Sequence, residues 1–95
     1  MEKLFEITDK TGRMIKLTSR QFEHIVCHKG MENYLEEIKE TLVNPIKIIP
    51  HEKGELYDYY KYYKNRKGNA KYLQVIVKYL NGQGFVITAY FVKHI

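Results

Sequence analysis

The sequence predicts an α+β fold in which two N-terminal helices pack on a four-stranded antiparallel sheet, preceded by a short β-hairpin. Apolar residues recur with a helical period between about residues 19 and 43, and with the period of a strand from residue 46 onwards. Short turns rich in Asn and Gly separate the last strands, and strands joined by short turns are antiparallel neighbours. A chain of 95 residues is expected to form one domain over residues 1–95.

Strands are predicted on both sides of the helical region. A hairpin comes first, because turn residues separate two short apolar runs at residues 3–7 and 14–17. The later strands are expected at residues 46–49, 56–64, 72–80 and 85–92.

The first helix is predicted over residues 19–29. Thr18 and Gln21 have the spacing of a capping box, and Gly30 suits a left-handed C-terminal end. The second helix is predicted over residues 32–43, before a proline that disfavours further helix. The side chains expected to pack on the sheet are Phe22, Ile25, Val26, Leu35, Ile38 and Leu42.

Composition narrows the class of protein. The net charge is +5, from 16 Lys and Arg against 11 Asp and Glu, which favours a polyanionic partner. No window approaches the ~18 consecutive apolar residues of a membrane span. The start of the chain lacks the layout of a signal peptide, and the single Cys27 excludes an internal disulfide. We therefore expect a cytoplasmic protein without a membrane partner.

Basic residues and tyrosines are interleaved in the second half of the chain. Tyrosine stacks on bases and donates to phosphates, so this mixture suits single-stranded RNA. For most of the nine tyrosines, packing in half-buried strands explains their presence better. The RNA-binding candidates are Tyr60, Lys61, Lys64, Arg66, Lys67 and Lys78.

The catalytic candidates are His24, Arg20, His28, Thr88 and Tyr90. In RNA transesterification the ribose 2′-hydroxyl attacks the adjacent phosphorus, so the enzyme needs no nucleophile and no metal. It needs a base, an acid and donors for the phosphorane. His24 can exchange protons near neutral pH, and Arg20, one turn earlier, can bind a phosphate. Thr88 and Tyr90 alternate on one face of the last strand and can donate to the phosphate.

Other chemistries have fewer candidates. His24 and His28 have the spacing of a metal pair on a helix, but a stable zinc site needs a third and usually a fourth ligand. Cys27 is expected in mid-helix, where no helix N-terminus favours the thiolate. We therefore predict no metal and no cofactor.

Strand register limits where Lys78 can be placed. If the last hairpin has a two- or four-residue loop, Thr88 and Tyr90 share a face with Val75 and Val77. Lys78 is then expected on the opposite face. It is kept as an RNA-binding candidate only.

The ordered set of motifs resembles phage-associated nuclease-like domains of the barnase, EndoU, colicin and RelE superfamily over about residues 15–93. The resemblance implies an α+β domain with metal-independent ribonuclease activity, as in toxins and phage effectors. It matches the helix histidine to His24 and the strand hydroxyls to Thr88 and Tyr90. Lys29 stands where many members have proline, and is expected to lengthen the helix. The motifs are Leu17-Thr18 with His24-Ile25 and His28, Ile38 to Pro45, Tyr72 to Val77, and Phe85 to Phe91.

Two functions remain open at this point, with a third, a protein–protein module, indicated only by the acidic second helix. The first is an RNA endonuclease, a toxin or mobile-element effector that leaves a 2′,3′-cyclic phosphate. The alternative is a non-catalytic RNA-binding module on the same fold, because fold alone does not confer function. The expected partners are RNA and, for a toxin, an inhibitor protein. The RNA target, the inhibitor and the oligomeric state are left open.

Overall fold

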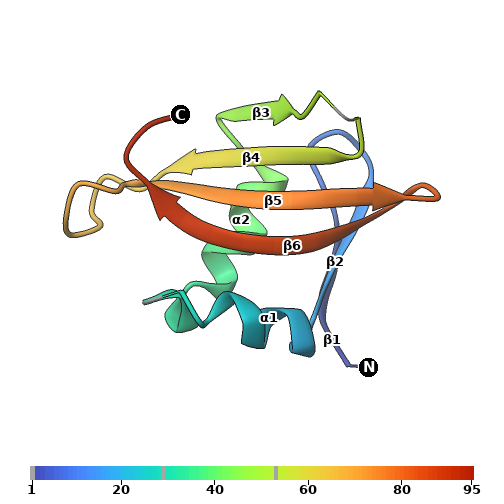
Figure 1. The fold of residues 1–95 in the computed structure, drawn as a ribbon, viewed down its shortest axis with the longest axis horizontal. Helices are drawn as coiled ribbons and strands as arrows, with labels where there is room; N and C mark the ends of the chain where they lie inside the picture. The colour runs from blue at the N-terminus through green and yellow to red at the C-terminus, as the bar shows by residue number, and fades with distance from the viewer. Residues whose placement is uncertain (1, 29, 53) are drawn as a thin grey trace.

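The computed structural model describes residues 2–28, 30–52 and 54–95 of the chain. Figure 1 shows the arrangement of the elements. In chain order these are β1 (Lys3–Thr8), β2 (Met14–Thr18), α1 (Ser19–Ile25), the 3₁₀ helix η1 (Met31–Asn33), α2 (Leu35–Val43), β3 (Lys47–Pro50), β4 (Leu56–Tyr62), β5 (Tyr72–Leu80) and β6 (Gln83–Val92).

The strands form one six-stranded mixed sheet in the order β1-β2-β6-β5-β4-β3. The α+β class is confirmed, as is the antiparallel pairing of β3 to β6. The four-stranded sheet with a separate hairpin is wrong, because β2 pairs with β6 in parallel over residues 14–16. The helices and strands β3 to β5 lie between β2 and β6 in the chain, so this pair has the long connection that parallel strands need. The hairpin also covers an edge of β6 that would otherwise expose unpaired backbone.

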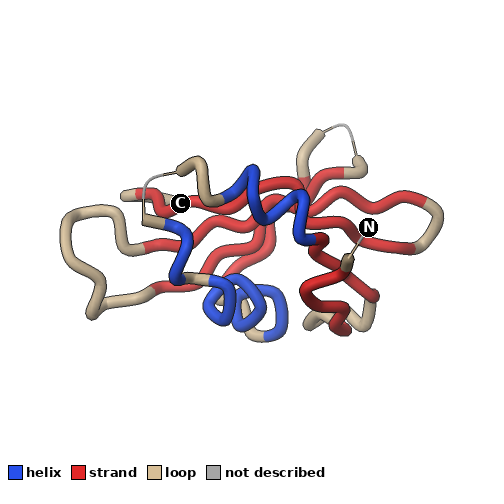
Figure 2. Tube along the Cα trace, turned by 90° about the horizontal axis from the view of Figure 1, so that it is seen from below, coloured by secondary structure: helices blue, strands red, loops and turns tan. Residues whose placement is uncertain are grey.

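The helices lie in the middle of the chain and cover one face of the sheet, so their predicted N-terminal position is wrong. Figures 1 and 2 show α2 behind the sheet and α1 along the β6 side. The predicted packing is confirmed except at Val26, which caps the end of α1 and is only half-buried, since Ile25, Ile38 and Leu42 are fully buried. The partly buried side chains of Phe22 and Leu35 pack against the same core. The helical stripes therefore face the sheet.

The first helix is shorter than predicted and ends at Ile25. After Val26 the amides bond three residues back: Cys27 N–H donates to the His24 carbonyl at 3.2 Å, and His28 N–H to the Ile25 carbonyl at 3.0 Å. Such bonds tighten the last turn into 3₁₀ geometry, which ends the α-helix. Gly30 is left-handed, with φ 84°, as predicted. The extra helical turn expected from Lys29 is absent from the described residues, and Lys29 itself lies outside them.

The second helical segment is divided in two. Residues 31–33 form η1, and α2 begins only at Leu35 because Tyr34 leaves helical geometry, with φ −113° and ψ 22°. The end of α2 at Val43 agrees with the stop predicted before Pro45.

A buried carboxylate joins the N-terminal hairpin to the sheet. Asp9 is 5% exposed and accepts hydrogen bonds from the hydroxyls of Tyr59 and Tyr79. It also accepts from the amides of Thr11 and Arg13, at 2.9 and 2.8 Å. Burial opposes ionisation, but these hydrogen bonds outweigh it and hold the pKa of Asp9 below its usual value. Burial raises the pKa of Tyr79 to about 12. Asp9 therefore stays ionised as an acceptor and Tyr79 stays protonated as a donor, as their hydrogen bond requires.

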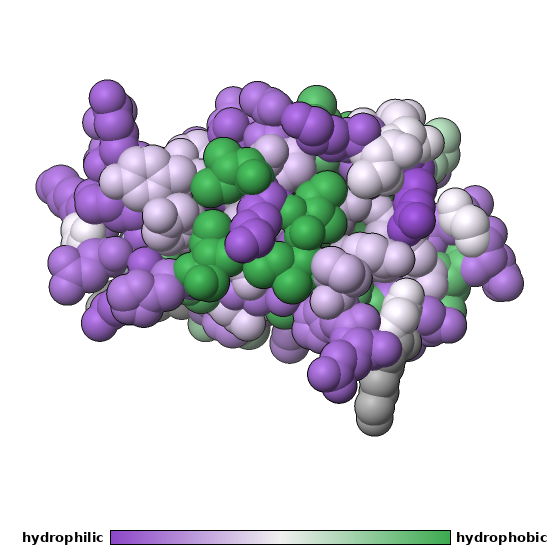
Figure 3. All heavy atoms as spheres, turned by 90° about the horizontal axis from the view of Figure 1, so that it is seen from above, coloured by the Kyte–Doolittle hydropathy of each residue, from purple (hydrophilic) through white to green (hydrophobic). Residues whose placement is uncertain are grey.

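The outer strand β3 leaves one edge of the sheet open. Figure 3 looks onto this side of the molecule and shows apolar side chains gathered there. Ile46, just before β3, is 56% exposed, and Ile48 and Ile49 are half-buried.

Among the described residues no helix is long and apolar enough to cross a membrane.

Candidate active site on the open face of the sheet

The face of the sheet opposite α2, named the open face, presents four of the candidate side chains: Tyr60, Lys78, Thr88 and Tyr90. Figure 1 looks onto this face, with α2 behind it. Side chains alternate along a strand, so the paired registers of β4, β5 and β6 give its members. They are Leu56, Asp58, Tyr60 and Tyr62 on β4, Tyr72, Gln74, Ile76 and Lys78 on β5, and Phe85, Thr88, Tyr90 and Val92 on β6.

A β-bulge at Ile87 decides which side chains of β6 face outward. Thr88 pairs with Ile76 of β5, but the register shifts by one residue at the next pair. An extra residue in one strand moves every following side chain to the other face. Thr88 and Tyr90 therefore lie on the same face as Lys78. The prediction that Lys78 faces away from them is wrong, although the hairpin turn has the two residues expected.

Gln21 of α1 is bonded to this bulge. Its side-chain amide donates to the carbonyl of Ile87, the residue without a partner in β5. Its backbone N–H donates to Thr18 Oγ1 at 3.1 Å, which confirms Thr18 as the helix N-cap. Gln21 is therefore bonded both to the N-cap of α1 and to the bulge that orients Thr88.

His28 reaches the open face from the turn that follows α1. Its Nε2 lies 3.2 Å from Thr88 Oγ1, and its ring centroid lies 5.3 Å from that of Tyr90 in an edge-to-face arrangement. His28 and both partners are half-buried. An imidazole, a hydroxyl and a phenol thus meet at the side of β6.

His24 is the next neighbour of this group. It is exposed in the last turn of α1, and its ring centroid lies 6.4 Å from that of His28. The two imidazoles do not share one helix, because His28 lies beyond its end. Arg20 is exposed one turn before His24 and forms no ion pair among the described residues. The structure therefore brings His28, not His24, into contact with Thr88.

Several basic candidates lie in the loop between β4 and β5, residues 63–71. Arg66 stacks on Phe91, with its guanidinium carbon 3.7 Å from the ring centroid. Arg66 and Gly30 line one groove, so this loop adjoins the turn that follows α1. Lys64 and Lys67 are exposed in the loop. Arg66 and Lys67 thus lie beside Gly30, two residues after His28.

Two other RNA-binding candidates are occupied by contacts within the fold. Tyr60 is 6% exposed, and its hydroxyl lies 3.5 Å from a carboxylate oxygen of Asp58. Lys61 lies on the opposite face, where its Nζ donates to the Asn44 carbonyl at 3.2 Å, at the end of α2. Neither ring nor ammonium is freely presented to a ligand on the open face.

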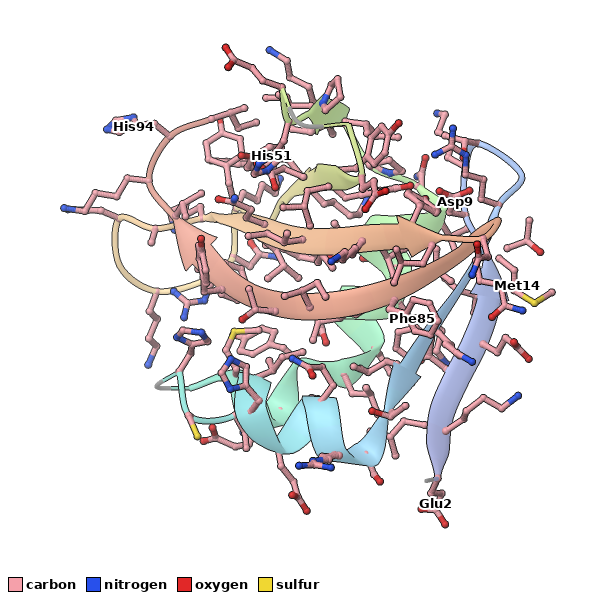
Figure 4. All side chains as sticks on the ribbon, turned by 45° about the vertical axis from the view of Figure 1, so that its right-hand side comes forward. Glu2, Asp9, Met14, His51, Phe85 and His94 are labelled. Atoms are coloured by element: carbon pink, nitrogen blue, oxygen red, sulfur yellow. The ribbon has the colours of Figure 1, made fainter. Side chains whose placement is uncertain are left out.

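A histidine–aspartate pair on this face was not predicted from the sequence. His51 Nε2 lies 2.8 Å from Asp58 Oδ1, and Asp58 is buried. Asp58 and Thr88 both pair with Ile76, so they flank it on β4 and β6. Figure 4 shows His51 beside β4. The lone acid in a tyrosine-rich strand was a usable signal for Asp58, whereas nothing in the loop marked His51.

Ligand-type side chains do not gather into a metal site in the part of the chain that the structure describes. No group of three or more His, Cys, Asp or Glu residues comes together there. Cys27 is exposed after the end of α1 rather than in mid-helix, and its Sγ lies 3.5 Å from the Glu23 carbonyl.

An α+β domain with an imidazole, a hydroxyl and a phenol gathered beside basic loops has the features of a nuclease-like protein. The family model described as phage-Barnase-EndoU-ColicinE5/D-RelE like nuclease2 matches residues 1–94. The chain belongs to this family, which confirms the resemblance noted in the sequence. No curated protein and no solved structure matches it.

Proposed function

We propose that the protein is a metal-independent endoribonuclease that cleaves single-stranded RNA by attack of a ribose 2′-hydroxyl on the adjacent phosphorus. The contact of His28 with Thr88 and Tyr90 is the observation that supports this most. Membership of a nuclease-like family supports the class of reaction. The reaction needs a base, an acid and donors to the phosphorane, and all three types of group are present.

In this proposal the scissile phosphate lies against Thr88 and Tyr90. The hydroxyl of Thr88 donates to a non-bridging oxygen, and His28 stands within reach of the same position. His28 and His24 act as the base and the acid, since histidine as a residue type exchanges protons near neutral pH. One imidazole accepts the proton of the 2′-hydroxyl, and the other donates a proton to the departing 5′-oxygen. The products are a 2′,3′-cyclic phosphate and a free 5′-hydroxyl.

The charge that develops on the phosphorane needs donors and cations. Tyr90 lies against His28, and Lys78 is on the same face as both. Preorganised donors of this kind stabilise the transition state more than the bound substrate. Arg20, on the exposed side of α1, is proposed to bind a neighbouring phosphate.

A non-catalytic RNA-binding module is the alternative. Tyr62 and Tyr72 pack on the open face with ring centroids 5.1 Å apart, and Tyr62 is 47% exposed. This pair and the basic loop would bind RNA whether or not chemistry follows. Detection of cleavage products separates the two functions.

Cleavage is expected to survive excess chelator. The reason is that only pairs of ligand-type side chains meet among the described residues, and a catalytic metal needs at least three protein ligands. The measurement is incubation of purified protein with single-stranded RNA in EDTA, followed by detection of fragments with cyclic phosphate ends. Loss of cleavage in EDTA, with recovery on adding a divalent cation, would contradict the metal-free mechanism.

Lys67→Ala is expected to weaken RNA binding without removing the chemistry. Lys67 is exposed in the loop beside the turn that carries His28, so it can contact phosphate but not the reacting atoms. Losing one phosphate contact should reduce the slope of log K against log salt by about 0.7 for a single strand. Lys10→Ala, in the exposed turn of the N-terminal hairpin, is the matched control and should keep the parent slope. Equal slopes for all three proteins would remove this loop from the RNA interface.

A further inference from the structure

A groove that the proposed chemistry does not use runs between β2, the start of α1 and β6. Its cavity volume is about 510 Å³. It is lined by Lys3, Lys16, Thr18, Gln21, Phe85, Val86 and Ile87.

The groove is continuous with the open face. Ile87, which lines it, directly precedes Thr88. Lys16 pairs with Phe85 across the parallel ladder, and Phe85 pairs with Lys78 across the antiparallel one. These three side chains therefore form one row beside the candidate catalytic group. Figure 4 shows Phe85 in the space between β6 and β2.

The lining combines an aromatic ring with a cation. Lys16 Nζ lies 4.8 Å from the ring centroid of Phe85, and both residues are half-buried. Aromatic rings bind unpaired bases by stacking, and lysines pair with phosphates. Thr18 adds a hydroxyl to the wall of the groove. A nucleotide offers a flat base and an anionic phosphate, which match these two features.

We propose that this groove binds the nucleotide next to the cleaved phosphate, with its base stacked on Phe85 and its phosphate paired with Lys16. This inference rests on the proposed ribonuclease function and names its substrate as RNA with an unpaired base at that position. Stacking requires Lys16 to leave the face of the ring. The ammonium exchanges a cation–π contact for a phosphate, so its charge remains paired.

The test is binding of a dye-labelled, fully 2′-O-methylated single-stranded RNA, which the proposed reaction cannot cleave. Phe85→Leu keeps an apolar side chain but removes the stacking surface, and is expected to weaken binding roughly 5- to 150-fold. Lys16→Gln should weaken binding and lower its salt slope by about 0.7. Lys39→Gln is the matched control, because Lys39 Nζ lies 5.7 Å from the ring centroid of Phe5, outside the groove.

The results separate this inference from the proposed reaction. If both groove variants bind like the Lys39→Gln control, the groove is not a nucleotide site, whatever the parent cleaves. If Phe85→Leu and Lys16→Gln bind more weakly than the control while the parent cleaves no RNA, the groove assignment stands and the catalytic proposal fails. A parent that binds duplex RNA as tightly as a single strand would overturn the stacking of an unpaired base. Thermal melts confirm that each variant is folded, and Lys16→Gln tests the site without altering the ring.

Discussion

Replacing His28 by alanine is expected to lower the rate of RNA cleavage by about two orders of magnitude or more. His28 is the imidazole that contacts Thr88, so in the proposed mechanism its removal deletes one of the two proton-transfer groups at the phosphate. His24→Ala should fall in the same range, because its ring is the nearest second imidazole, 6.4 Å away by centroid. The measurement is kcat/KM on one single-stranded RNA at fixed pH and salt.

Two further histidine variants show whether the loss of cleavage is specific to His24 and His28. His94→Gln changes an exposed histidine near the C-terminus, which Figure 4 shows away from α1, and should leave the rate unchanged. His51→Gln tests the imidazole on the other side of the open face, and should also cleave like the parent. If His51→Gln loses activity while His28→Ala does not, the proton-transfer groups lie beside β4. If His24→Ala and His28→Ala both cleave like the parent, the active-site assignment is wrong.

The elements that the sequence predicts well are those with local causes. The turn at Asn81 and Gly82 is one example, because both residues adopt positive φ, 53° and 81°, as a two-residue hairpin turn requires. The N-cap at Thr18 is another, since its side chain bonds an amide only three residues away. Such features depend on a few neighbouring residues and can be read without the rest of the fold.

Features that depend on distant contacts were not predictable in the same way. The bulge at Ile87 has no Gly or Pro to mark it, and the amide bound to its carbonyl comes from Gln21 in another element. One extra residue there reverses the faces of Thr88 and Tyr90, so the register argument failed for Lys78. The parallel pairing of β2 with β6 likewise joins short segments from opposite ends of the chain.

Which of the two histidines, His24 or His28, contacts Thr88 depends on where α1 ends. Four-residue spacing places His24 and His28 on one side of a helix only if the helix continues through both. The chain instead tightens after Ile25, which carries His28 toward β6 and leaves His24 exposed. Helix ends are set within one or two residues by competing backbone bonds, which sequence spacing alone does not resolve.

The carboxylate of Asp9 is expected to be the largest single polar contribution to stability. Asp9→Ala should lower the free energy of unfolding by about 3 kcal/mol, because the hydroxyl of Tyr59 and the amides of Thr11 and Arg13 lose their acceptor in a buried position. This is a large fraction of the roughly 5–15 kcal/mol that stabilises a typical domain. Asp9→Asn keeps one acceptor oxygen and should cost less. Urea unfolding at pH 7 measures both, with Glu55→Gln as an exposed control.

The same carboxylate should make stability depend on pH in the acid range. Its folded-state pKa is lowered, so it contributes stability that is present above the unfolded value of about 3.9 and is lost as pH falls through the folded value. The parent should therefore lose stability relative to Asp9→Asn as the pH is reduced below about 4. The prediction is wrong if the free energies of unfolding of the parent and Asp9→Asn fall equally with decreasing pH. It is also wrong if Asp9→Ala unfolds within about 0.5 kcal/mol of the parent.

Because the hairpin also covers the edge of β6, a destabilised Asp9 variant should expose the β6 edge amides to hydrogen exchange before those of β4 and β5.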